Sequence, residues 1–448
     1  MISDQSAPSD SQALRGKRLL VVLGSYRSKR HIYERARELG ILLVILDGPR
    51  HWTESCAGPD DLVERHLSVD LAPFDTFVAR SVEAVRGAGL ALDGLGTIDG
   101  FAGGFASRIA NVLGLPFHTV EATDLARDKH RAREAYAAAG LPGPRFARIE
   151  GRGDLQSAAE GVGFPAVLKP VTGVGSVQTF LVRDMHELQL RHAEIVARAS
   201  EVRARASVGL TSDEAWFNLM WSGGASVLLE SWVEGPKFDV DLLLDDGRVV
   251  YGHATDDLDP CGLRDVRRVA PSGLAPAEER ELIDHAAACV LTLGFRRGMF
   301  NVEVKRTCEG PRLIEVNGRL GGYSTTDIHH EVWGIDLVEQ WLRASLSLPL
   351  EVVETVPSCF VAESLLPSPR TGTLMRDGFL DHLAPSPQLL AARQWAFAGD
   401  VVAGVETGAP DWLGAVLTRG VTQGVALAEL DRLVASIDFP VASGMETT

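Results

Sequence analysis

FNVEVK at residues 300–305 and LIEVNGR at residues 313–319 are two strand-like runs that each carry an acidic side chain. Alternate side chains of a strand point to the same face, so the asparagine and the glutamate of each run share a face. A turn near Glu309 would join the runs as an antiparallel hairpin, with Glu303 directly opposite Glu315. The two runs therefore predict a pair of carboxylates side by side on one face of a hairpin.

This hairpin is a candidate metal site. Facing carboxylates raise one another's pKa unless a cation lies between them. Magnesium prefers hard oxygen ligands, commonly one or two carboxylates, so Glu303, Glu315 and Asn317 are the candidate ligands. The alternative is a surface hairpin with a solvated polar face. Arg319 and the Gly321-Gly322 pair that follow favour an anion site beside the metal.

Length and charge limit the classes of protein that remain. The chain has 448 residues and a formal net charge of −16. This length suggests about three domains or subdomains. The acidic charge argues against nucleic-acid and anionic-membrane partners, which both need a basic surface. The five cysteines form no CxxC pair, which excludes the usual zinc and disulfide frameworks and indicates a reducing compartment.

Residues 1–15 are polar and lack the apolar core of a signal peptide, so we expect a flexible tail. No apolar run reaches the roughly 18 residues that a membrane-spanning helix needs. We therefore expect a soluble, cytoplasmic protein that acts on small molecules. The oligomeric state stays open, with a homodimer as one alternative.

The first part of the chain has the pattern of an open α/β domain. An apolar strand at 18–24, a helix at 32–39 and a second strand at 41–46 form a βαβ start. The loop 24–29 after the first strand lacks the GxGxxG and P-loop patterns. We therefore interpret this loop as a substrate contact rather than a dinucleotide site.

A glycine-rich loop marks the second part. We expect a helix at 124–139, ended by Gly140 and Pro142, with Lys129 in its first turns. The strand 166–170 then leads into the loop. Backbone N–H groups of such a loop can lie against phosphates, and Lys169 just before it supplies a positive charge. Further predicted elements are a strand at 180–182, helices at 185–206, 276–293 and 335–346, a strand at 227–235 and a hairpin of 238–244 with 249–251.

The order of these stretches resembles the ATP-grasp superfamily, and within it the carboxylate-amine ligases of the L-amino-acid ligase and carnosine synthase group. The resemblance covers about residues 18–348 and is carried by residues 126–129 (ARDK), 167–170 (VLKP), 173–176 (GVGS), 228–235 (LLESWVEG) and 314–322 (IEVNGRLGG). It implies an α/β (α+β) ATP-grasp fold. The implied parts are a tail (1–15), an N-terminal open parallel-sheet domain (16–124), a linker and lid (125–229), a core with the metal site (230–348) and an additional C-terminal region (349–448).

The resemblance also implies residue roles. The implied ATP contacts are Lys129, Lys169, Gly173, Gly175, Ser176, Glu230, Val233 and Lys237. Lys237 stands where relatives usually carry a ribose-binding acid, and Asp239 or Asp241 are alternatives for that contact. Glu303 and Glu315 would bind one magnesium ion, and Glu315 with Asn317 a second, with manganese as a substitute. Arg319, together with Lys169, would act catalytically on the transferred phosphoryl group.

Substrate contacts are the least specific part of the pattern. Arg268 could bind a substrate carboxylate through its planar fork, or it could be a surface arginine in the charged run 264–268. Ser324 could supply a hydroxyl to the substrate. His330 could face the substrate, or cap or pack its helix. Three further acids, Asp256, Asp257 and Asp259, are interpreted as a solvated loop rather than a metal cluster.

Together these patterns predict an ATP-dependent ligase that joins a carboxylate, such as an amino acid, to an amine through an acyl phosphate and releases ADP and phosphate. One alternative is a carboxylase that activates bicarbonate on the same scaffold. Another is an ATP-binding regulatory protein without turnover.

Overall fold

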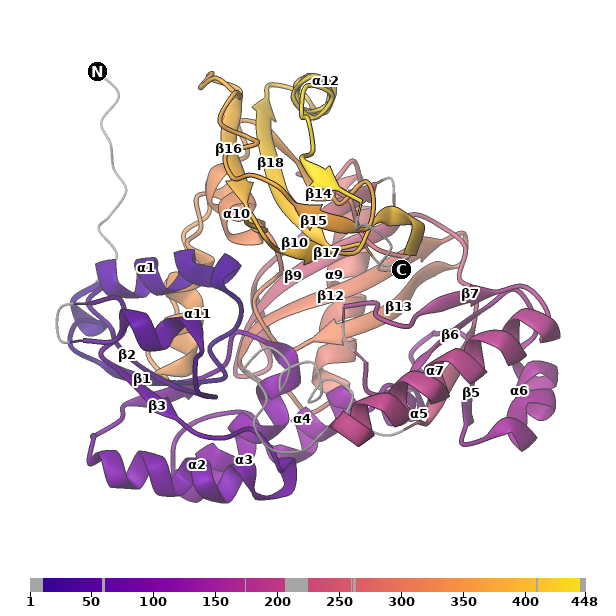
Figure 1. Cartoon of the computed structure of the whole chain (residues 1–448), viewed down its shortest axis with the longest axis horizontal. Helices are drawn as coiled ribbons and strands as arrows, with labels where there is room; N and C mark the ends of the chain where they lie inside the picture. Colours follow the sequence, from indigo (N-terminus) through magenta and orange to yellow (C-terminus); the bar gives the residue numbers. More distant parts are fainter. Residues whose placement is uncertain are drawn as a thin grey trace.

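The computed structural model describes residues 11–58, 61–173, 175–205, 225–258, 260, 263–407 and 410–443, and the fold is given for these residues (Figure 1). Most of the predicted tail, the last five residues and Asp259 lie outside them. Within these ranges, no helix has both the length and the hydrophobicity to cross a bilayer.

The N-terminal domain is an open parallel sheet, as predicted. Its strand order is β3-β2-β1-β4, with all neighbours parallel. The strands are β1 (Arg18–Val22), β2 (Leu42–Asp47), β3 (Arg65–Ser68) and β4 (Gly94–Gly96). Leu19 and Val21 pack with α1 (Arg30–Glu38) and α11 (Leu337–Ser345), whereas Leu20 and Val22 pack with α2 (Phe74–Ala88) and α3 (Gly103–Leu113). Helices on both faces explain why β1 is apolar from Leu19 to Val22.

The lid is a four-stranded antiparallel sheet of order β5-β8-β6-β7. Its elements are β5 (Phe146–Ile149), α6 (Leu155–Val162), β6 (Ala166–Pro170), β7 (Phe180–Val182), α7 (Met185–Arg205) and β8 (Val227–Ser231). The glycine-rich loop joins β6 to β7, so the predicted order of strand, loop and strand is confirmed.

The predicted continuous helix at 124–139 is wrong. The structure has two helices, α4 (Val120–Arg127) and α5 (Lys129–Ala138), separated at Asp128. Asp128 is extended, with φ −89° and ψ 97°, and its side chain accepts a hydrogen bond from the Arg131 N–H as an N-cap. Asp side chains compete with the helical backbone in this way. The break makes Lys129 the first residue of α5, and its N–H donates to the Val171 carbonyl of the lid at 3.0 Å.

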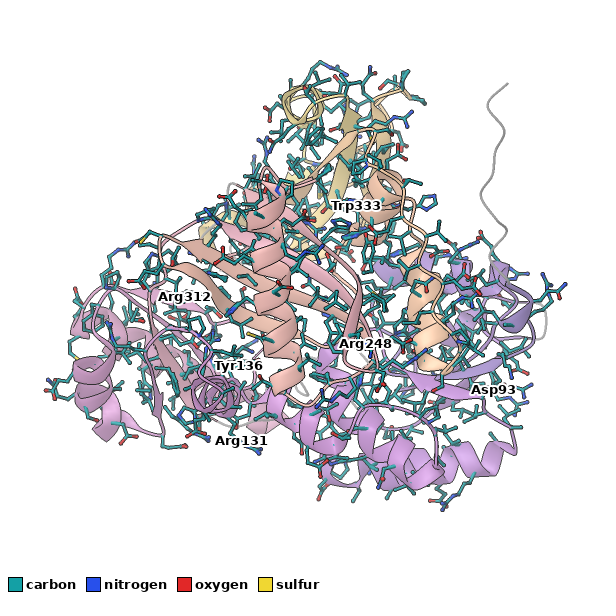
Figure 2. All side chains as sticks on the ribbon, turned by 180° about the vertical axis from the view of Figure 1, so that it is seen from behind. Asp93, Arg131, Tyr136, Arg248, Arg312 and Trp333 are labelled. Carbon is teal, nitrogen blue, oxygen red and sulfur yellow. The ribbon has the colours of Figure 1, made fainter. Side chains whose placement is uncertain are left out.

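The centre of the molecule is an eight-stranded antiparallel sheet of order β13-β12-β9-β10-β11-β14-β18-β16. Its strands are β9 (Lys237–Asp245), β10 (Arg248–Leu258), β11 (Arg267–Ala270), β12 (Gly298–Thr307), β13 (Gly310–Asn317), β14 (Phe360–Pro367), β16 (Leu389–Gln394) and β18 (Trp412–Gly420). Seen from behind, α9 (Pro276–Thr292) lies along the sheet and buries its apolar side against β9 and β12 (Figure 2).

The C-terminal region continues this sheet. β14, β16 and β18 come from beyond the predicted boundary at 348/349, so one sheet contains strands from both sides of it. The remaining elements of this region are α12 (Gln423–Val434) and a small sheet of β15 (Gly372–Leu374), β17 (Val401–Val402) and β19 (Val441–Ala442). α10 (Thr325–Trp333) and α11 connect the central sheet to the N-terminal domain. The boundaries themselves stay predictions.

Candidate functional site

The β12–β13 hairpin has the predicted register. Glu303 lies opposite Glu315, and Asn301 lies opposite Asn317. A register shift after Glu303 then leaves Ile314 outside the ladder, and its carbonyl accepts a hydrogen bond from Arg133 at 2.7 Å. The two acids therefore stand side by side because of strand pairing, as their sequence spacing indicates.

Each of these two acids has a lysine beside it. Lys129 Nζ lies 2.9 Å from Glu315 Oε1, and Lys237 Nζ lies 3.1 Å from Glu303 Oε2. Burial alone would raise the pKa of Glu315, but Lys129 and Lys169 outweigh it and lower that pKa. Burial raises the pKa of Glu303, as do nearby acids including Glu315, and Lys237 offsets only part of this. The pKa values of the two acids are therefore shifted in opposite directions.

The donor set fits a hard divalent ion. Glu303, Glu315 and Asn317 offer carboxylate and amide oxygens on one face of the hairpin. Magnesium typically takes one or two carboxylates together with water and substrate phosphate oxygens. Burial is the largest cause of the raised pKa of Glu303, and a cation bound beside the carboxylate would lower that pKa.

Glu230 joins the lid to α5. Its side chain is buried, with Lys169 Nζ at 2.6 Å and Arg133 Nε at 2.5 Å. Burial would raise the pKa of Glu230, but Arg133 and Lys169 lower it to about 2. Lys169 and Glu230 were both predicted, whereas Arg133 was missed because a single arginine on a polar helix carries no signal.

The glycine-rich loop presents its backbone towards α5. Lys129 Nζ donates to the Gly173 carbonyl, and Ser176 Oγ donates to the Leu263 carbonyl at 3.5 Å. Gly175 and Ser176 both have left-handed backbones, with φ of +61° and +56°. On the other side of the lid, the Val233 carbonyl accepts from Lys305 Nζ at 3.0 Å. The ATP contacts implied for this loop and for Val233 stay predictions.

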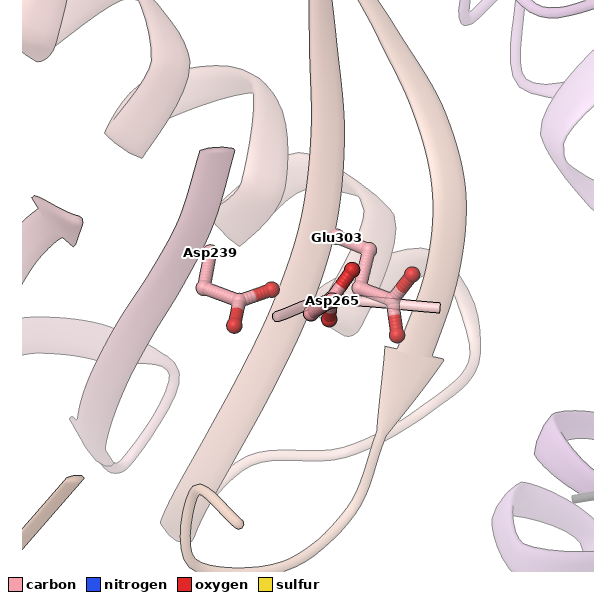
Figure 3. Close-up of side chains that lie close together, drawn as sticks. All are labelled: Asp239, Asp265 and Glu303. Carbon is pink, nitrogen blue, oxygen red and sulfur yellow. The ribbon is translucent and has the colours of Figure 1, made fainter. Parts of the chain in front are cut away.

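Lys237 lies inside a group of acids. Its Nζ is 3.0 Å from Asp257 Oδ2 and 2.5 Å from Asp265 Oδ1, in addition to its contact with Glu303. Asp239, Asp265 and Glu303 each place an oxygen within 4.8 Å of the other two (Figure 3). Burial would lower the pKa of Lys237, but the acids around it raise this pKa well above its usual value.

The interpretation of Asp256 and Asp257 as solvated loop residues is wrong. Both lie on β10; Asp256 is 8% exposed, and the Asp257 side chain is 3% exposed. Burial and the neighbouring Asp265 raise the pKa of Asp257 to about 9. A strand ending in consecutive acids resembles a loop in sequence, so its burial becomes visible only in the sheet.

Arg268 is not a surface arginine. It lies on β11, is 3% exposed, and directs Nε to Glu363 Oε2 at 2.9 Å and a terminal nitrogen to Thr325 Oγ1 at 3.0 Å. Burial would lower its pKa, but Glu363 and Asp239 raise it. Glu363 on β14 was missed, although an acid inside the apolar run FVAESLLP (360–367) is a usable signal. The substrate role of Arg268 stays a prediction.

Ser324 belongs to the group of residues around Arg268 and Glu363, whereas His330 does not. The Ser324 N–H donates to Glu363 Oε1 at 3.2 Å, and its hydroxyl accepts from Arg393 at 3.3 Å. His330 is exposed on α10, and no contact among the described residues ties it to this group. Its neighbour His329 is fully buried, with Asp241 at 3.2 Å.

Arg319 lies against the N-terminal domain. The Arg319 side chain lies next to Gly100, since a Cβ atom added at Gly100 would be 3.7 Å from Arg319 Cγ. One terminal nitrogen of Arg319 donates to the Leu320 carbonyl at 2.7 Å. Lys29, at the end of the loop 24–29, interacts electrostatically with Arg319 across this junction. Burial and then Arg319 lower the pKa of Lys29 to about 8. Two cations from different domains therefore interact electrostatically here, together with Asp99.

Comparisons with known proteins identify the family. A family model described as "ATP-grasp domain" matches residues 162–327. The D-alanine–D-alanine ligase of Stutzerimonas stutzeri is 30% identical over 245 residues, which are 53% of this chain and 68% of that protein. The chain belongs to the ATP-grasp family.

Two further comparisons describe how this ATP-grasp chain relates to others. Human carnosine synthase 1 is 31% identical over 340 residues, which are 72% of this chain but 39% of that protein. The chain thus spans about two fifths of this relative. A crystal structure of an L-amino acid ligase from Bacillus licheniformis has a TM-score of 0.80 at 20% identity and covers 96% of this chain and 100% of its own. The predicted ATP-grasp fold, with a parallel sheet in the N-terminal domain and antiparallel sheets in the rest, is confirmed.

Proposed function

We propose that this protein is an ATP-dependent ligase that joins a carboxylate substrate to an amine and releases ADP and phosphate. The observation that carries the proposal is the in-register pairing of Glu303 with Glu315, with Lys129 in contact with Glu315. The relatives named as ligases and synthases support the same reaction class.

ATP would bind between the lid and the central sheet. Lys129, Lys169 and the loop 173–176 would hold the phosphates, because the two lysines and backbone N–H groups supply positive charge. Glu230 and the backbone of Val233 would contact the nucleoside end. Glu303, Glu315 and Asn317 would hold two magnesium ions, or manganese in their place, and bound magnesium neutralises the charge of the triphosphate.

The chemistry needs positioning and charge rather than a covalent enzyme nucleophile. An oxygen of the substrate carboxylate attacks the γ-phosphorus, and ADP leaves with the electrons of the broken P–O bond. The amine nitrogen then attacks the acyl carbon, loses a proton, and phosphate leaves. Lys169 and Arg319 would stabilise the charge on the transferred phosphoryl group, and the closed lid would exclude water from the acyl phosphate.

The substrate end would lie where the N-terminal domain meets the central sheet. Lys29 and Arg319 offer positive charge to a carboxylate, and Ser324 offers a hydroxyl. Arg268 already has a carboxylate partner in Glu363, so we propose that it positions the residues around the substrate and does not bind the substrate itself. His330 is not included because it is exposed. We expect an amino acid as the carboxylate substrate.

The proposal extends to the cellular compartment and the assembly of the protein. Cys56, Cys289, Cys308 and Cys359 are free thiols, which supports a reducing, cytoplasmic location. The assembly stays open, with a homodimer as one alternative. We also retain the five-part domain division, with the C-terminal region as part of the structural core.

A paired substrate screen tests the function. Amino acids and amines are supplied in pairs with MgATP, and ADP release and product mass are measured. We expect ADP only when both partners are present, together with a product whose mass is their sum minus water. ADP release that needs bicarbonate but no amine would favour the carboxylase alternative, and nucleotide binding with no turnover in any arm would favour a regulatory protein.

A further inference from the structure

The Lys237 ammonium forms ion pairs with three acids. A lysine ammonium has three N–H donors and no acceptor. The three carboxylate oxygens of Asp257, Asp265 and Glu303 lie 3.0, 2.5 and 3.1 Å from Nζ. These three acids come from β10, from the segment before β11 and from β12, so a single cation ties together parts of the chain that are distant in sequence.

A fourth acid lies near this ammonium. The acid cluster is defined as Asp239, Asp257, Asp265 and Glu303, and Asp239 interacts electrostatically with Lys237. Asp239 is 5% exposed, and its Oδ1 has no hydrogen-bond partner among the described residues. Its other oxygen lies 3.7 Å from Arg268, whose fork is already bonded to Glu363. A buried, unpartnered carboxylate oxygen beside two further acids is a feature of a cation site.

The cluster therefore has the ligands of a divalent site, but a lysine in its centre. Asp239, Asp265 and Glu303 bring their oxygens together closely enough to share one ion (Figure 3). Lys237 donates a hydrogen bond to Asp265 at 2.5 Å and forms ion pairs with Asp257 and Glu303 at 3.0 and 3.1 Å. A magnesium ion in the same place would need an octahedral shell with about 2.1 Å to each ligand. The Lys237 ammonium occupies this place and therefore excludes the ion.

We propose that Lys237 is the resident cation of the acid cluster, which keeps a divalent ion out of it and turns one oxygen of Glu303 away from the hairpin metal site. Lys237 is then a positioning residue. It engages Oε2 of Glu303 and leaves Oε1 for the magnesium shared with Glu315. The expected consequence is that divalent ions bind on the Glu315 side of Glu303 and not on the Asp265 side.

Titration with Mn²⁺ in the absence of nucleotide tests this proposal, with free Mn²⁺ followed by electron paramagnetic resonance. We expect Lys237→Met to bind one more Mn²⁺ per chain than the unsubstituted protein, at least about tenfold more tightly than its other sites. Lys237→Arg should keep the original number because it keeps the cation. Lys17→Met is the control, since Lys17 makes an exposed ion pair with Asp93 outside the cluster.

A second substitution locates the new ion. Adding Asp265→Asn to Lys237→Met should remove the extra site. If Lys237→Met is unfolded without metal, then Mn²⁺ should restore a cooperative melting transition that EDTA abolishes, whereas the double variant should show no such dependence. An unchanged Mn²⁺ count in a folded Lys237→Met protein would overturn the proposal, as would an extra site that survives Asp265→Asn.

The inference concerns the metal site of the proposed ligase, but its test uses neither ATP nor substrates. A failed substrate screen would leave the Mn²⁺ result standing. An unchanged Mn²⁺ count would refute the role of Lys237 whatever the screen gives.

Discussion

Glu230 is a buried carboxylate between two buried cations, and its pKa is lowered to about 2. A group whose pKa is depressed on folding stabilises the protein above its unfolded pKa, and this stabilisation is lost as the pH falls through the folded value. Its contribution should therefore be complete at neutral pH and should disappear between the usual value of 4.5 and about 2.

Glu230→Gln should lower the free energy of unfolding by about 3–5 kcal/mol at neutral pH, because Arg133 and Lys169 would lose their buried partner. Urea denaturation at a series of pH values measures this, and the difference from the unsubstituted protein should shrink as the pH falls below 4.5. Glu34→Gln is the matched control, since Glu34 pairs with Arg30 on the surface. A difference that stays constant at low pH would contradict the account.

We expect Lys29 to contribute to binding of the carboxylate substrate. Lys29→Met should raise KM for the carboxylate substrate by about tenfold and leave KM for ATP unchanged, because it removes one of the two cations at this junction. Its pKa of about 8 sets the pH dependence. Above that pH the ammonium loses its charge, so KM of the unsubstituted enzyme should rise there, and this rise should be absent in Lys29→Met. A rise of the same size in both proteins would exclude Lys29.

Among the elements, the hairpin could be predicted from sequence and the break between α4 and α5 could not. Strand alternation and a short turn are local, so the partners of Glu303 and Asn301 follow from spacing alone. The cap at Asp128 is also local, but the apolar spacing of residues 124–139 continues through it. A tertiary contact determines where the helix breaks, because the Lys129 N–H donates to the Val171 carbonyl of the lid.

Asp128→Ala should destabilise the protein by about 1 kcal/mol, as expected for loss of an N-cap, and should weaken ATP binding by misplacing Lys129. Urea denaturation and nucleotide titration measure the two effects. Thr422→Ala offers a control, because Thr422 caps α12, which is part of the C-terminal region. Equal loss of ATP affinity in both variants would argue against a specific role for the α4–α5 break.

For the whole molecule, the sequence predicts the order of the parts but not the contacts between them. Arg268 and Glu363 are 95 residues apart and meet only because β11 pairs with β14. Lys237 reaches acids from three other segments in the same way. Such contacts depend on strand order across the sheet, which a single sequence does not determine. The C-terminal region, without a predicted role, proves to extend the central sheet.

A fragment ending at residue 348 should therefore not fold. It would lack β14, β16 and β18, expose the edge of β11 and leave Arg268 without Glu363. Thermal melting followed by circular dichroism and limited proteolysis measure this, with the full chain as the reference. A fragment that melts cooperatively and binds ATP would show that the C-terminal region is a separate domain.

We propose that facing acids on the β12–β13 hairpin hold divalent ions at a nucleotide site. A crystal structure with Mn²⁺ and a non-hydrolysable ATP analogue, in which anomalous scattering locates the ions, tests this directly. We predict Mn²⁺ bound by Glu303 and Glu315, with Lys129 and Lys169 on the phosphates. A well-ordered nucleotide whose ions lie away from both glutamates would contradict the account.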